Sequence, residues 1–221
     1  MSTTNNTQIL LPGELIRREN QTEFKLKFGG KLNEVDASTL GYSLLNITNL
    51  VQEVNQELAT GQKIEIKVKA HAPGSFLVHL ALDPSYVAPL MANVTPESVK
   101  AVAEAATTII GTLAALFGLR KVLKGDPPKE VTQKEGEVQI QNNSGATVVV
   151  DQRTYNAYFT NPKVNDALSK TFKTLENDPS ISTFEITDEK EVPIIEVSRD
   201  EFHDMALSIW KLHQEVDKQP E

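Results

Sequence analysis

The sequence contains no cysteine among its 221 residues. Disulfide bonds, thiolate metal sites and thiol catalysis are therefore excluded. It also contains no phosphate-binding loop, no dinucleotide-binding glycine motif, no zinc-protease helix, no nucleophile elbow and no EF-hand loop. Because these signatures are absent, we expect no cofactor and no metal site, and a protein that acts by binding rather than by catalysis. An enzyme with a site of unrecognised type stays open as an alternative.

Basic residues are in the minority. The chain has 22 Lys and Arg against 30 Asp and Glu, a net charge of −8, which argues against general nucleic-acid binding. Most of this net negative charge lies in residues 181–221, which contain eleven acidic and four basic residues. We interpret this segment as a solvated acidic face, and the alternative is a surface that recruits a basic partner. The polar start, Met1–Gln8, lacks a signal-peptide pattern, so we expect a flexible tail over 1–21 and a cytoplasmic protein, peripheral to a membrane in one alternative.

Residues 22–95 predict a β-α-β-β domain. Residues 22–28 alternate between apolar and charged side chains, as in a half-buried strand. Asp36 or Ser38 can then cap a helix whose apolar residues recur every three or four positions, and Gly61 is well placed to end it.

A hairpin follows this helix. Residues 64–70 and 76–82 alternate in the same way, and matching their apolar faces places Val68 opposite Val78. We therefore expect a small antiparallel sheet with one helix on its apolar face.

Residues 96–125 predict a hydrophobic helix between two domains. Its stretch Ala105–Leu119 has fifteen residues and no charge, fewer than the ~20 apolar residues that span a bilayer. Such a helix must be buried by its own chain, another copy or a membrane. Small residues recur at every fourth position, which suits close helix contact. We therefore predict a homo-oligomer, over a lipid-bound monomer, with its interface at Ile110, Gly111, Ala114, Ala115 and Gly118.

Residues 126–221 predict a second α+β domain. We expect a hairpin turning at 142–145 and two helices after it, the second capped by Asn161 with Pro162 at its first position. Two strands follow, Ile181–Thr187 and Val192–Val197. A capping box at Ser198–Glu201 then opens a final helix with apolar residues from Phe202 to Val216.

Two groups of residues are candidate ligand sites. The first lies on the outer face of the first sheet, where basic side chains would form a compact patch for a phosphate or carboxylate: Lys25, Lys27, Lys67, Lys69 and His79. The second is on the short helix after 147–150, where Arg153, Tyr155 and Tyr158 could stack on a base or a peptide. The alternatives are an ordinary lysine-rich strand exterior and tyrosines that pack the domain.

Three segments resemble a family of uncharacterised bacterial and prophage proteins. They are Lys67–Phe76 (KVKAHAPGSF), Gly118–Lys121 (GLRK) before Gly125, and Val197–Phe202 (VSRDEF). The resemblance covers about residues 22–205. The family implies no established reaction and no catalytic residues. Its mobile-element setting implies, by association, a role in conflict between phage and host.

The overall prediction is an α+β protein that acts as a non-catalytic, oligomeric binding protein and sequesters a small anionic or nucleotide ligand. The main alternative is a membrane-surface protein that uses the helix at 105–119.

Overall fold

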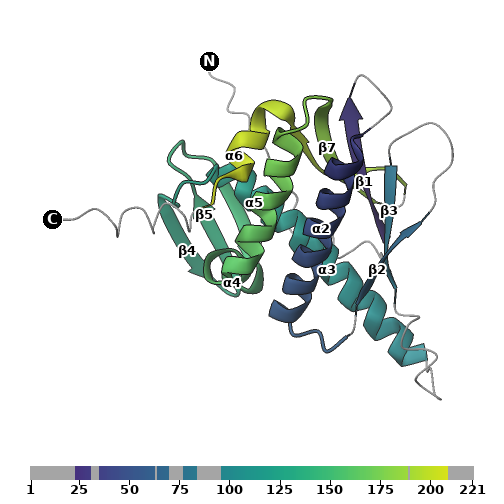
Figure 1. The fold of residues 1–221 in the computed structure, drawn as a ribbon. Helices are drawn as coiled ribbons and strands as arrows, with labels where there is room; N and C mark the ends of the chain where they lie inside the picture. The colour runs from purple at the N-terminus through teal and green to yellow at the C-terminus, as the bar shows by residue number, and fades with distance from the viewer. Residues whose placement is uncertain are drawn as a thin grey trace.

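The computed structural model describes residues 23–30, 35–62, 64–69, 77–83, 96–188 and 190–208. It has the predicted α+β architecture, drawn in Figure 1. A 3₁₀ turn at Arg199–Glu201 precedes the last helix. In chain order, the other elements are β1 (Glu23–Gly30), α2 (Ala37–Glu57), β2 (Glu65–Lys69), β3 (Leu77–Asp83), α3 (Pro96–Leu123), β4 (Glu130–Lys134), β5 (Glu137–Gln141), β6 (Thr147–Asp151), α4 (Gln152–Thr160), α5 (Pro162–Glu176), β7 (Ile181–Thr187), β8 (Pro193–Ser198) and α6 (Phe202–Ala206).

The larger sheet joins the two halves of the chain. Its strand order is β2-β3-β1-β7-β8, and every neighbouring pair is antiparallel. The prediction gave 22–95 and 126–221 separate sheets. This is wrong for β7 and β8, because β7 pairs with β1 and β8 pairs with β7. The buried apolar residues of both halves form one core cluster.

The register of the first hairpin also differs from the prediction. Val68 pairs with Leu80, not with Val78, so the strands are shifted by two residues. A shift of two leaves each side chain on its expected face, because side chains alternate with period two. The apolar face of β1 is buried as expected, with Phe24 and Leu26 at 0% exposure.

The smaller sheet is a meander of order β4-β5-β6. Its β5–β6 hairpin turns at Asn142–Gly145 as predicted, and the Asn142 side chain donates to the Val122 carbonyl at the end of α3 (2.7 Å). Strand β4 was not predicted, because its sequence EVTQK has one large apolar residue and all five residues are exposed.

The C-terminal half of helix α3 crosses behind α2 and α5 at the centre of the molecule in Figure 1, and its N-terminal end projects away from them. Phe117 of α3 lies 5.5 Å from Phe172 of α5 and 6.3 Å from Phe184 of β7, measured between ring centroids. Phe28 and Phe202 extend this cluster to β1 and α6. Aromatic pairs at these distances add to the free energy gained by burying the rings.

The predicted caps are present. Asp36 accepts from the backbone of Ser38 and Thr39 at the start of α2, and Asn161 caps α5 with Pro162 at its first position. The capping box of Ser198 and Glu201 is formed.

Two helix ends differ from the prediction. Helix α2 ends at Glu57, and the left-handed residue after its cap is Ala59, two positions before Gly61. Helix α6 ends at Ala206, because Leu207 is extended, so the final helix does not run on unbroken. The predicted apolar positions from 209 to 216 lie outside the described residues.

Candidate functional site

The strand register brings the predicted basic residues of the larger sheet to one face. Lys25 of β1 is paired across the sheet with His79 of β3, which is paired with Lys69 of β2. Lys67 and Lys27 hold outward positions in neighbouring rows. The side chains of Lys69 and His79 lie outside the described part of the structure, so only their strand positions are known.

This face is not a basic patch. Lys25 donates to Glu191 at 3.0 Å, and Lys27 contacts both oxygens of Glu185 of β7 at 2.9 and 3.1 Å. Lys25 is itself buried, with 8% of its surface exposed. The charged side chains described at outward positions are four acidic and three basic: Glu23, Glu65, Glu185, Glu196, Lys25, Lys27 and Lys67. The expected basic surface is therefore corrected to one of alternating charge, and anion binding there stays a prediction.

The second predicted group does not form one surface. On α4, Arg153 is exposed, Tyr155 is half-buried, and Tyr158 is fully buried. Tyr158 packs against Phe159, with ring centroids 5.0 Å apart. Tyr158 is a core residue and cannot stack on a ligand at the surface together with Arg153.

Tyr158 instead belongs to a buried polar centre between α3, α4 and α5. The guanidinium of Arg120, which is fully buried, lies 5.4 Å from the centre of the Tyr158 ring. It donates to the Asn165 side-chain oxygen at 2.8 Å, and to Ser169 Oγ and the Asn165 carbonyl at 3.3 Å each. The Asn165 amide in turn donates to the Tyr158 carbonyl. No carboxylate lies within ion-pair distance of Arg120 in the described part of the chain.

The electrostatics of this centre follow from burial. Desolvation lowers the pKa of Arg120 and raises that of Tyr158, and the charge of each group partly opposes the shift of the other. The arrangement links three helices and offers no open surface, so we assign it to stability rather than to chemistry. Sequence patterns missed it because Asn165 and Ser169, which accept hydrogen bonds from Arg120, lie more than 40 positions away along the chain.

The predicted oligomer interface is buried inside the chain itself. Every residue from Ile109 to Arg120 is buried, and this range includes all five predicted interface positions: Ile110, Gly111, Ala114, Ala115 and Gly118. Of the three predicted ways to bury this helix, the chain itself covers these five positions, through contacts of α3 with α2, α4, α5, α6 and both sheets. A homo-oligomer stays a prediction. Ala103–Leu123 is long and apolar enough to cross a bilayer, but 83% of its most apolar window is buried, as in the core helix of a soluble protein.

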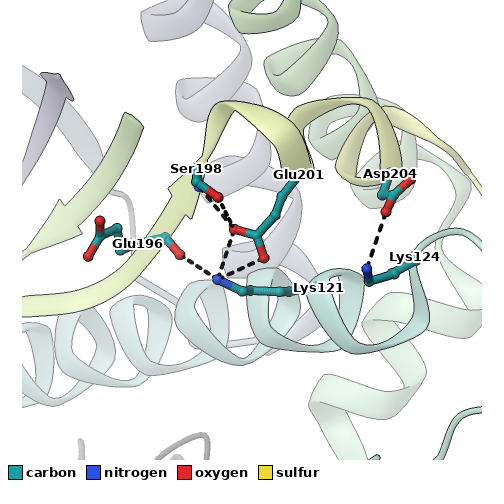
Figure 2. A network of polar contacts seen from close by, with 6 residues as sticks. All are labelled: Lys121, Lys124, Glu196, Ser198, Glu201 and Asp204. Carbon is teal, nitrogen blue, oxygen red and sulfur yellow. Dashed lines mark hydrogen bonds and ion pairs between the residues drawn. The ribbon is translucent and has the colours of Figure 1, made fainter. Parts of the chain in front are cut away.

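The charged end of α3 is also engaged within the chain, as Figure 2 shows. Lys121 donates to Glu201 at 3.0 Å and to the Glu196 carbonyl at 2.9 Å. Glu201 also accepts from the backbone and hydroxyl of Ser198. Burial raises the pKa of Glu201, but the hydrogen bonds from Ser198 and Lys121 outweigh it and hold that pKa below its usual value. These contacts fasten α6 to α3.

The described residues contain no group of three His, Cys, Asp or Glu side chains that could hold a metal ion. His203 of α6 is exposed, and its Nδ1 lies 3.0 Å from a carboxylate oxygen of Glu176 on α5. This side chain is part of a surface contact between two helices.

The exposed face of α2 is a feature that the sequence patterns missed. None of its exposed positions carries a charge: they are Ala37, Ser38, Gly41, Tyr42, Leu45, Asn49, Gln52 and Gln56, here called the neutral face. Tyr42 and Leu45 are 61% and 54% exposed. The two acidic residues of α2 turn towards α5, where Glu53 contacts Lys163 and Glu57 accepts from Asn161.

Helix α5, which packs beside α2 in Figure 1, has the opposite surface. Apart from Pro162 at its start, its exposed positions are all charged: Lys163, Asp166, Lys170 and Lys173. The difference between two adjacent helices could have been found in the sequence by sorting the residues of 37–57 by helix face.

No protein family, no curated protein and no solved structure matches this chain. The resemblance to prophage proteins is therefore still a prediction.

Proposed function

We propose that the protein is a non-catalytic binding protein that docks a protein partner on the neutral face of α2. The observation that carries the proposal is the absence of charge at every exposed position of a 21-residue surface helix, in a chain with net charge −8. Surface helices of soluble proteins ordinarily carry charged residues on the side that faces water.

Desolvation explains why such a face suits docking. A charged side chain loses several kcal/mol of hydration when a partner covers it, unless the partner supplies a matching charge. Amide and hydroxyl groups lose less and can exchange water for hydrogen bonds with the partner. The centres of protein interfaces are accordingly depleted in charged residues and enriched in tyrosine.

Tyr42 and Leu45 lie one helical turn apart and supply the apolar centre of this face. Ser38, Asn49 and Gln56 flank them along the helix and supply hydrogen-bonding groups. The partner surface that fits is apolar at its centre and uncharged at its edge, such as an amphipathic helix laid along α2.

Site-specific photocrosslinking tests the proposal. A photoreactive phenylalanine derivative replaces Tyr42 in one version of the chain and Lys170 of α5 in the control, and both are irradiated in the cells that naturally make the protein. We expect a discrete protein adduct from position 42 and none from position 170. We also expect Tyr42→Glu with Leu45→Glu to abolish capture of the same partner by the purified chain, and Asp166→Ala with Lys170→Ala on α5 to leave it unchanged.

Circular dichroism of both double variants checks that the fold is intact, since all four positions are exposed. The absence of an adduct at position 42, or equal capture by the α2 variant and the native chain, would show that α2 is not a docking face.

A further inference from the structure

The smaller sheet ends in a strand that no other described part of the chain covers. Strand β4 is first in the order β4-β5-β6, so it pairs with β5 on one side only. All residues from Lys129 to Glu135 are exposed. An uncovered edge strand presents unpaired N–H and C=O groups and is a template for pairing with another strand.

The charges of this edge are self-complementary. Its sequence from Lys129 to Glu135 is KEVTQKE. When two copies run antiparallel about Thr132, Glu130 of each lies opposite Lys134 of the other, and Val131 lies opposite Gln133. The flanking Lys129 and Glu135 continue the same complementarity.

Other arrangements lose this match. Parallel pairing in register places Glu130 against Glu130 and Lys134 against Lys134, and like charges directly opposite each other destabilise a pair. If the two-fold axis lies at Val131 instead, the strands are shifted by two residues. Glu130 then lies opposite Thr132, and Lys134 has no residue of β4 opposite it. Within the described residues, Glu130 and Lys134 make no ion pair that would compete with a partner strand.

We propose that two copies of the chain associate through their β4 edges, antiparallel about Thr132, so that the two meanders become one six-stranded sheet. This interface differs from the one predicted on α3 and does not depend on the neutral face of α2. Two five-residue strands bury less area than the ~1,200 Å² of a stable interface, so we expect a reversible dimer that forms at micromolar or higher concentration.

Charge reversal tests the register. Sedimentation equilibrium over a concentration series should show the native mass rising from 24.4 kDa towards twice that value. Lys134→Glu and Glu130→Lys each place like charges opposite each other twice in the dimer. We expect each variant alone to associate at least about tenfold more weakly. The double variant reverses both charges and should regain association.

Mixing gives a sharper form of the same test. The Glu130→Lys chain has lysine at both 130 and 134, and the Lys134→Glu chain has glutamate at both. The mixture should therefore dimerise more strongly than either component alone. Lys170→Glu and Asp166→Lys on α5 change the net charge by the same amounts and should dimerise like the native chain.

Cross-linking locates the two-fold axis. Because the chain has no cysteine, Thr132→Cys introduces a single thiol, and the proposed axis brings the two copies of this residue within disulfide range. Mild oxidation should give a covalent dimer, whereas Lys170→Cys should not. A native chain that is still monomeric at about 100 μM would overturn the proposal. So would a dimer that neither single charge reversal weakens.

Discussion

Replacing Arg120 with Met should change stability much less than replacing it with Ala. Arg120 is fully buried, contacts Tyr158 through its guanidinium and has no carboxylate partner among the described residues. The charge and the volume of Arg120 therefore make separate contributions to the free energy of unfolding, and the two substitutions distinguish these contributions. Met keeps most of the volume and removes the charge, whereas Ala removes both.

The contacts of the guanidinium set the expected magnitude. Burying an unpaired charge costs several kcal/mol. Against this cost stand one good hydrogen bond at 2.8 Å, two long ones at 3.3 Å, and the contact with the Tyr158 ring. A hydrogen bond to a charged group contributes about 1.5–3 kcal/mol and a desolvated ring contact about 2 kcal/mol, so gain and cost nearly cancel.

The Met variant also leaves the Asn165 oxygen without its donor, which costs about 1–3 kcal/mol. We therefore expect Arg120→Met to lie within about 2 kcal/mol of the native free energy of unfolding, in either direction. Arg120→Ala adds a cavity among three helices and should be about 2–5 kcal/mol less stable than the Met variant.

Urea unfolding at pH 7, followed by far-UV circular dichroism, measures both differences, and equal slopes show that the transitions are comparable. Arg153→Met is the matched control, because Arg153 is exposed and its replacement should change stability by no more than about 0.5 kcal/mol. If Arg120→Met is as unstable as Arg120→Ala, the guanidinium contacts outweigh the burial of the charge and the reasoning is wrong.

Two further predictions concern the larger sheet and the capping box. A Cβ atom on Gly29 would lie 2.1 Å from Thr183 Oγ1 on the paired strand, so Gly29→Ala should cost about 1–3 kcal/mol. Thr183→Ala should recover part of that loss in thermal unfolding, and additive losses would show that the two sites do not clash. The pKa of Glu201 is lowered in the folded state, so its contribution to stability is present above the unfolded pKa and is lost as pH falls through the folded pKa. Glu201→Gln should cost about 1 kcal/mol at pH 7 and progressively less as pH falls below the unfolded pKa of glutamate, and a cost independent of pH would contradict the assignment.

The sequence determined the local structure of this protein. Alternation identified β1, β2 and β3, and helical periodicity identified α2. Capping side chains at Asp36, Asn161 and Ser198 identified helix starts, because a cap depends only on residues within one turn. The α+β class followed from these elements. Strand β4 was not predicted, because an edge strand exposed on both faces has no period-two pattern of apolar residues.

Only the tertiary structure decided the neighbours of each element. The outward lysines of β1 were correctly placed, but Glu185 and Glu191, which neutralise two of them, are more than 150 positions away in sequence. The uncharged run of α3 was equally visible, but whether it meets lipid, another copy or its own chain depends on which surfaces surround it. Periodicity reports which face of an element is apolar. The partner that covers that face is selected by the packing of the whole chain, because burial of apolar area is non-directional and any complementary surface can satisfy it.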